Sequence, residues 1–191
     1  MTNLNESLLS DSLSSVMMRY SESFSAKTYG TENNDYDPLM SAFGITPELK
    51  RQNRQYWGRE LGMCWQLLVV ELCKHSYEKF SPALKYGGDE PCDLCLDRHA
   101  IDTKYRIGSG DSGTLKKFKA NGKMLREEGF TPVLLIVRTD NLPAAVTACR
   151  SGSWVIYQGG TAFSYLQKKT GFDLCAWLET EAKKETFHIK R

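Results

Sequence analysis

The segment TPVLLIVR, residues 131–138, places the tightest constraint on the fold. Its residues are nearly all apolar and lack the alternation of apolar and polar side chains that marks a strand with one solvated face. Such a run predicts a strand that is buried on both faces. A sheet built around it needs a covering layer on each side, and the 191 residues of the chain are enough to supply one.

The pattern on either side of this strand predicts those layers. Thr46 is a suitable N-cap and Pro47 a suitable first-turn residue for a helix that we expect to end near Lys79. Its buried face is predicted by apolar residues at steps of three and four, namely Trp57, Leu61, Trp65, Leu68 and Leu72. Further strands are expected at 92–97, 100–107 and 154–158, and further helices at 114–128, 142–150, 161–168 and 172–182. This order predicts an α/β fold with a mixed sheet flanked by helices.

Residues 1–45 differ from the rest in composition, being rich in Ser, Asn, Asp and Glu. We expect a partly ordered polar arm with a short helix there, and one domain over residues 46–191.

The composition narrows the classes of function. The net charge is +2, so a nucleic-acid surface would have to be a local patch. No apolar run approaches the roughly 18 residues that a membrane span needs, so we expect no membrane partner. The first residues, MTNLNESLLSDSLSS, lack the basic region and apolar core of a secretory signal. We therefore expect a cytoplasmic protein whose six cysteines are reduced thiols.

The segment CDLCLDRHAIDTKYR, residues 92–106, carries the most specific chemistry. If Arg98 and His99 form a two-residue turn, Cys95 faces Asp102 and Asp93 faces Lys104. In that register Asp93, Asp102 and Lys104 share one face of the hairpin, and a slip of one residue would separate them. The alternative without catalysis is that these three residues form the solvent-exposed face of an ordinary hairpin.

A shared face of this kind has a defined chemistry. Two carboxylates a few ångströms apart repel each other unless a cation lies between them, and oxygen ligands favour Mg²⁺, with Mn²⁺ as a substitute. The ion would polarise a phosphodiester and activate a water molecule. Lys104 could orient that water, deprotonate it if its own pKa were depressed, or stabilise the transition state.

A zinc site is the competing reading of the same segment, with Cys92, Cys95 and His99 as ligands. Cys92 and Cys95 are an odd number of residues apart, so in a regular strand they point to opposite faces. We therefore expect ordinary buried cysteines, and His99 as a turn residue.

The motif Pro91-Cys92-Asp93, followed by Asp102-Thr103-Lys104, resembles that of the PD-(D/E)xK nuclease superfamily. One residue separates the proline from the first aspartate, which departs from the strict Pro-Asp pair. Residues 101–118, IDTKYRIGSGDSGTLKKF, resemble type II restriction endonucleases, and together with residues 141–154 the ApaLI-like family.

This resemblance implies a restriction-endonuclease-like mixed sheet and a homodimer that cleaves double-stranded DNA at a short palindrome with Mg²⁺. It also implies 5′-phosphate ends and a cognate DNA methyltransferase that forms no stable complex with the nuclease. Asp93, Asp102 and a glutamate of the long helix, Glu60 or its rival Glu71, would hold the metal beside the catalytic Lys104. Contacts to DNA are expected from residues that follow the catalytic strand, namely Arg106, Ser109, Asp111, Ser112, Lys116 and Lys117.

Two other functions fit the same residues. One is a DNA repair or recombination nuclease with the same core. The other is a non-catalytic DNA-binding module that contains zinc.

Overall fold

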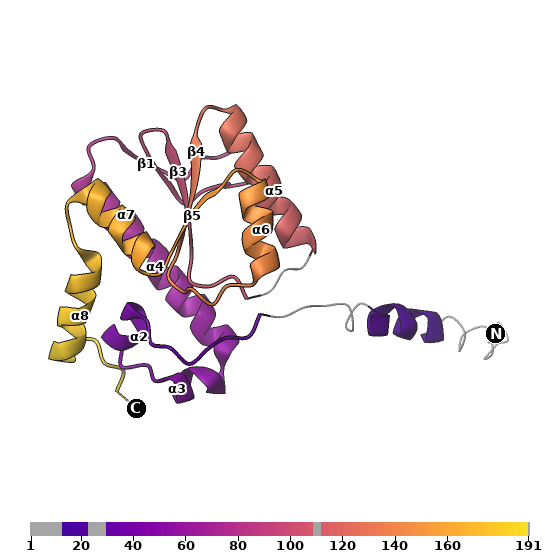
Figure 1. The fold of residues 1–191 in the computed structure, drawn as a ribbon, viewed down its shortest axis with the longest axis horizontal. Coiled ribbons are helices and arrows are strands. Elements are labelled where there is room, and N and C mark those ends of the chain that lie inside the picture. Colours follow the sequence, from indigo (N-terminus) through magenta and orange to yellow (C-terminus); the bar gives the residue numbers. More distant parts are fainter. Residues whose placement is uncertain (1–12, 23–29, 109–111, 191) are drawn as a thin grey trace, which may run out of the picture.

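A five-stranded mixed sheet forms the centre of the protein in the computed structural model, which describes residues 13–22, 30–108 and 112–190 (Figure 1). The strands are β1 (Phe80–Pro82), β2 (Leu94–Leu96), β3 (His99–Lys104), β4 (Thr131–Ile136) and β5 (Val155–Gln158), and they lie side by side in that order. The first three strands are antiparallel, whereas β4 runs parallel to both β3 and β5. The expected mixed α/β architecture is confirmed.

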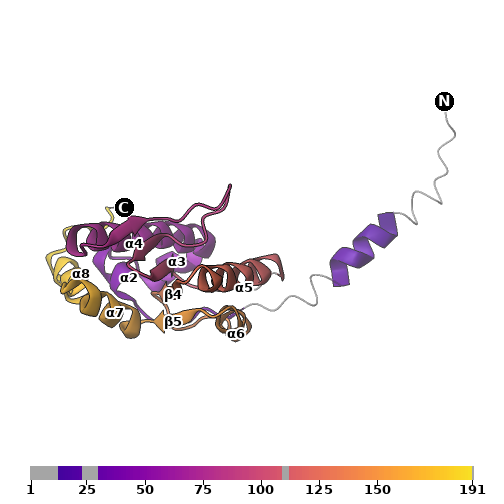
Figure 2. The same ribbon diagram turned by 90° about the horizontal axis from the view of Figure 1, so that it is seen from above.

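Helices cover both faces of this sheet, as the apolar β4 requires. One face is covered by α2 (Pro38–Ala42), α4 (Arg54–Ser76), α7 (Gly160–Thr170) and α8 (Leu174–Lys184), and the other by α5 (Ser112–Glu127) and α6 (Pro143–Ser151) (Figures 1 and 2). The sheet separates a larger core, on the side of α4 and α7, from a smaller core on the side of α5 and α6. Along β4, Val133 and Leu135 lie in the larger core, and Leu134 and Ile136 lie in the smaller one. Among the described residues, no helix has the length and apolar character to cross a membrane.

The long helix expected over residues 47–79 is two helices, α3 (Pro47–Gln52) and α4. Asn53 separates them with φ −153° and ψ 75°, and its side chain accepts a hydrogen bond from the Tyr56 amide at the start of α4. An asparagine in a non-helical conformation can end one helix and cap the next, and its side chain offers the first turn an acceptor. Thr46 and Pro47 begin α3 as expected.

Part of the segment expected as a polar arm belongs to the body. Leu39 and Met40 of α2 are 0% and 1% exposed and lie in the larger core. The segment just before α2 is held by a buried ion-pair network, in which Arg138 pairs with Asp37 and Asp140. Residues 13–22 form the expected short helix, while 1–12 and 23–29 lie outside the described residues.

Candidate functional site

The hairpin of β2 and β3 carries the candidate catalytic residues, and its register differs from the expected one. The paired residues are Leu94 with Ile101, Cys95 with Ala100 and Leu96 with His99. Asp97 and Arg98 therefore form the turn, and Asp97 takes the left-handed conformation with φ 55°. Aspartate tolerates that conformation better than most residues, because its short polar side chain can form local hydrogen bonds.

The expected register was wrong by two residues, but the expected assignment of side chains to the two faces of the hairpin is unaffected. Side chains alternate with a period of two, so a shift of two residues leaves each one on its own side. Leu94, Leu96 and Ile101 lie in the larger core and Cys95 and Ala100 in the smaller one.

Asp93 lies just before β2, opposite Asp102 if the register is continued. Its amide donates to the Ile101 carbonyl at 2.8 Å. Its carboxylate accepts three hydrogen bonds, from the amide and hydroxyl of Thr103 at 2.7 Å each and from the Gln66 side chain at 2.8 Å. Asp93 thus reaches towards Thr103 and α4, which strict alternation did not predict. Asp93 precedes the regular strand, so its side chain need not follow the alternation of the strand.

Asp102 lies beside this carboxylate with only 9% of its surface exposed. Burial raises the pKa of the Asp102 carboxyl to about 6, the negative charge of Asp93 adds to the rise, and Lys104 opposes it. A buried carboxyl next to a second carboxylate is held nearer to protonation than a free one, because burial and the like charge outweigh the attraction of Lys104. This is the electrostatic setting in which a divalent cation binds.

Lys104 completes the group. Its ammonium donates to Asp102 Oδ1 and to the Thr103 carbonyl, both at 2.9 Å, and lies 5.8 Å from the centre of the Phe118 ring. Burial alone would lower the pKa of Lys104, but the charges of Asp102 and Asp93 outweigh it and raise that pKa above its ordinary value. A depressed pKa was the condition for Lys104 to act as a base, and the structure shows the opposite. Lys104 is a permanent cation and hydrogen-bond donor.

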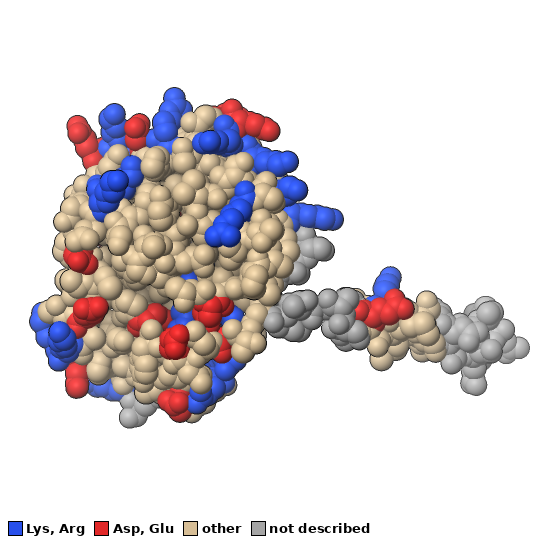
Figure 3. Space-filling view, viewed as in Figure 1, with Lys and Arg blue, Asp and Glu red and all other residues tan. Residues whose placement is uncertain are grey.

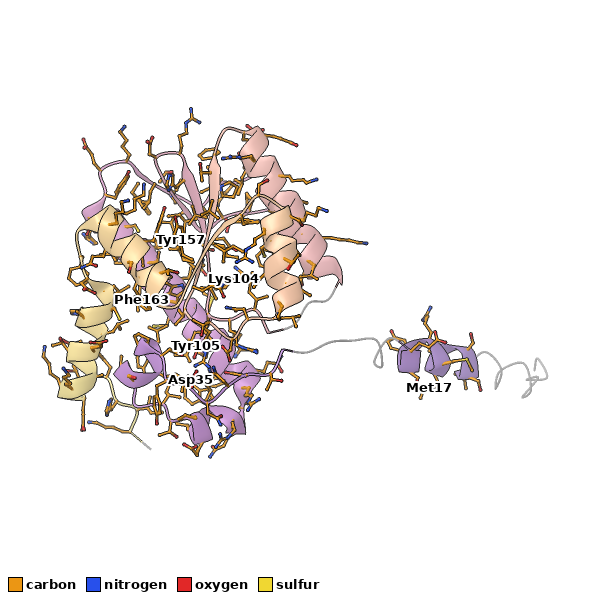
Figure 4. All side chains as sticks on the ribbon, viewed as in Figure 1. Met17, Asp35, Lys104, Tyr105, Tyr157 and Phe163 are labelled. Atoms are coloured by element: carbon orange, nitrogen blue, oxygen red, sulfur yellow. The ribbon has the colours of Figure 1, made fainter. Side chains whose placement is uncertain are left out.

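Asp102 and Lys104 border a pocket of about 190 Å³ between the sheet and α5. Asp102 and Lys104 form part of its wall, together with Glu90, Pro91, Thr114, Lys117, Phe118, Asn121 and Trp154. Figure 4 labels Lys104 near the middle of the body. A substrate phosphate in this pocket would meet both carboxylate and ammonium.

The donor set of this centre suits Mg²⁺. In the described part of the chain, no three His, Cys, Asp or Glu side chains gather in a way that could hold a metal ion. Mg²⁺ does not need such a cage, because it keeps several waters and takes one or two carboxylates from the protein. Asp93 and Asp102 would supply those two.

The side chain of α4 that reaches this centre is Gln66, which the sequence reasoning missed. Glu60 is instead bonded to Arg59 at 2.9 Å, and Glu71 to His75 at 2.8 Å, both in exposed positions. A signal for Gln66 existed in the sequence: it follows the buried Trp65 directly, so it borders the core-facing stripe of the helix. Gly62, one turn earlier, lies against Tyr105, which follows β3.

The candidate DNA contacts divide into three groups. Arg106 is turned into the body, where its guanidinium donates to the Gly30 and Asp140 carbonyls at 3.0 Å each and pairs with the Asp140 carboxylate. The structure thus gives Arg106 a role in holding the chain together. Ser109 and Asp111 lie outside the described residues, and Ser112 begins α5.

Lys116 and Lys117 are exposed on α5, where other basic side chains gather (Figure 3). Lys117 also lines the pocket and bonds to Asp89 at 2.8 Å. Phosphate contacts from this helix remain a prediction that its position favours.

Of the three candidate zinc ligands, Cys92 and Cys95 come together and His99 does not join them. The Cys92 and Cys95 sulfurs are 3.8 Å apart on the same side of the sheet, so the expectation that they point to opposite faces was wrong. Cys92 precedes the regular strand, so the alternation of side chains between the two faces does not apply to it. His99 is the first residue of β3 and not a turn residue, and its Nδ1 lies 2.7 Å from the Tyr165 hydroxyl, in the other core.

Comparisons of this chain with protein-family models, with curated proteins and with solved structures found no match.

Proposed function

We propose that this protein is a Mg²⁺-dependent endonuclease that hydrolyses double-stranded DNA. The observation that carries the proposal is the pair of Asp102 and Lys104 at the wall of an open pocket, with the Asp93 carboxylate close enough to raise the pKa of Asp102. Two carboxylates that raise each other's affinity for a cation, beside a fixed ammonium, fit the hydrolysis of a phosphodiester.

In this proposal the chain supplies binding, orientation and charge. A bound Mg²⁺ would polarise the phosphodiester and lower the pKa of a bound water. Asp93 and Asp102 would hold the ion, and Thr103 and Gln66 fix the Asp93 carboxylate through three hydrogen bonds. Lys104, held by Asp102 and the Thr103 carbonyl, places positive charge where the phosphate becomes more negative in the transition state.

The order of elements supports the resemblance to PD-(D/E)xK nucleases. A long helix, the hairpin, a further helix and a buried strand follow one another as α4, β2–β3, α5 and β4. Helix α5 adds exposed lysines beside the pocket, where a DNA backbone would pass. We further propose the narrower function of a type II restriction endonuclease. It would act as a homodimer with one centre for each strand of a palindrome and be paired with a DNA methyltransferase.

Incubation of the purified chain with long unmethylated DNA tests the proposal, with Mg²⁺, with Mn²⁺ and with EDTA. Lys104→Ala removes the central ammonium, and Lys85→Ala serves as a matched control, since Lys85 is 76% exposed and pairs with Glu90 at the surface. Discrete bands that need the metal and vanish only with Lys104→Ala are the expected result.

Other results have defined meanings. Nicks or a smear in place of bands would reject the restriction enzyme and favour a repair nuclease. Failure to cleave any DNA with either metal would overturn the nuclease itself.

A further inference from the structure

The helix at residues 13–22 presents an apolar stripe to solvent. Leu13, Val16 and Met17 are 56%, 43% and 71% exposed, and Tyr20 continues the same spacing. Residues three, four and seven positions apart lie on one side of a helix, which is the pattern of a helix that binds in an apolar groove. Figures 1 and 4 show this helix, with Met17 labelled, apart from the body.

Such a helix needs a surface to pack against. Isolated helices shorter than about 12–15 residues are marginal in water even when they are rich in alanine. The described residues of this one number ten and include serines and a valine, which are weaker helix formers. Its stability must therefore come from burial of the stripe.

The body carries an apolar groove with no helix of its own in it. The groove has a volume of about 340 Å³ and lies between the C-terminal half of α4 and the start of α8, where Leu68, Leu72, Phe172, Leu174 and Trp177 line it. Phe172 and Trp177 are 42% and 36% exposed.

The apolar surface of α4 extends beyond the groove. Met63 and Leu67 are 50% and 62% exposed, and they lie two turns and one turn, respectively, before Glu71 at the groove's edge. The groove and this stripe together form an elongated apolar surface on which a short helix can lie.

The helix cannot reach this groove in its own chain. Gly30, where the body begins, is bonded to Gly108 and Arg106 and lies against Leu142, just before α6. Figure 1 shows that the chain leaves the body on the α6 side, and that the end of α4 and the start of α8 lie on the opposite side. Residues 23–29 span at most about 30 Å when extended, and the ten helical residues add about 15 Å. A body of this size is about 40 Å across, so a path over its surface between opposite sides is about 60 Å long.

We infer that the helix at residues 13–22 of one copy binds the α4–α8 groove of a second copy, and that two copies exchange these helices in a two-fold dimer. Each chain offers one helix and one groove, so the exchange closes at two chains and leaves neither apolar surface exposed. The inference rests on the helix, the groove and the reach of the linker. The proposed nuclease adds a use for it, because cleavage of both strands of a palindrome needs two centres.

Met17 and Met18 provide a matched pair for the test. Both are exposed, at 71% and 63%, but Met18 lies about 100° further round the helix, off the stripe. The mass of the full chain is measured by light scattering over a series of concentrations, without DNA or divalent metal. Far-UV circular dichroism and thermal unfolding check that each variant remains folded. The wild type is expected at twice the monomer mass of 21.7 kDa.

Met17→Glu is expected to weaken the dimer at least about 100-fold, because each lost apolar contact costs about tenfold and symmetry counts it twice. Met18→Glu is expected to leave the dimer unchanged. Leu67→Glu tests the groove side and is expected to weaken the dimer as Met17→Glu does.

A mixture of the Met17→Glu and Leu67→Glu chains decides whether the exchange is between copies. In an exchanged dimer the intact helix of the second chain meets the intact groove of the first, so mixing restores one of the two contacts and part of the dimer. A monomeric wild type, equal effects of Met17→Glu and Met18→Glu, or no recovery on mixing would each overturn the inference. A dimer that cleaves no DNA would leave it standing and reject only the nuclease.

Discussion

Replacement of Asp102 by asparagine should stabilise the metal-free protein and abolish its response to Mg²⁺. The Asp102 carboxyl is buried next to Asp93, and its pKa is raised to about 6, chiefly by burial and further by the Asp93 charge. At neutral pH the folded protein therefore holds an ionised group that it would hold more readily as the neutral acid. Asparagine has the shape of that acid and carries no charge.

The pKa sets the size of the effect. A rise of the pKa from 3.8 to about 6 corresponds to about 3 kcal/mol. The attraction of Lys104 is already part of that pKa. Because the folded-state pKa is the higher one, the penalty is absent below pH 3.8, grows between pH 3.8 and 6 and is constant above. We expect Asp102→Asn to add up to about 3 kcal/mol above about pH 7, or roughly 6–12 °C in Tm, and nothing at low pH.

Urea unfolding in EDTA at about pH 8, 6 and 4 measures this dependence. Asp89→Asn is the control, because Asp89 is 67% exposed and paired with Lys117 at the surface, and we expect a change within about 0.5 kcal/mol. Added Mg²⁺ should stabilise the wild type and the control but leave Asp102→Asn unchanged.

A loss of stability in Asp102→Asn at high pH would refute the reasoning, since it would mean that the ionised carboxylate is well accommodated without a metal. An equal gain at every pH would refute it as well, because the effect would then not come from the charge.

Four further outcomes follow from the structure. Lys104→Met should reduce cleavage at least about 100-fold and preserve the thermal shift that Mg²⁺ produces, and loss of both would contradict a role confined to the transition state. Gln66→Leu removes a hydrogen bond from Asp93 and should weaken Mg²⁺ binding about tenfold by calorimetry, whereas an unchanged affinity would remove Gln66 from the centre. Lys117→Ala should weaken DNA binding uniformly across sequences and reduce the slope of log K against log salt by about 0.9; an unchanged slope would exclude a phosphate contact. Arg138→Met breaks two buried ion pairs and should cost about 3–5 kcal/mol in urea unfolding, and a neutral result would show that the network is dispensable.

The sequence determined the fold class and the grouping of the central residues. The apolar run at 131–138 required layers on both faces of its strand, and α5 and α6 on one side and α4 and α7 on the other supply them. The alternation along residues 94–104 put the leucines in the core and Asp102 with Lys104 on the other face. These conclusions rest on the periodicity of side chains along a strand, which is local and survives an error of two residues in the register.

The tertiary structure decided which residues actually touch the site. The turn of the hairpin is fixed from outside it, because β1 pairs with Leu96 and the Asp97 amide donates to the Lys79 carbonyl, while His99 bonds to Tyr165. Gln66, rather than either glutamate of α4, reaches Asp93 because of how that helix is rotated on the sheet.

The contacts of the Arg106 side chain also depend on residues that are distant in the sequence. It follows β3 as a DNA contact would in the proposed nuclease, yet Gly30 and Asp140 take up its hydrogen bonds. These partners are 76 and 34 residues away in the chain. Local sequence specifies which side of an element a residue is on, but only the packing of remote segments specifies what it meets there.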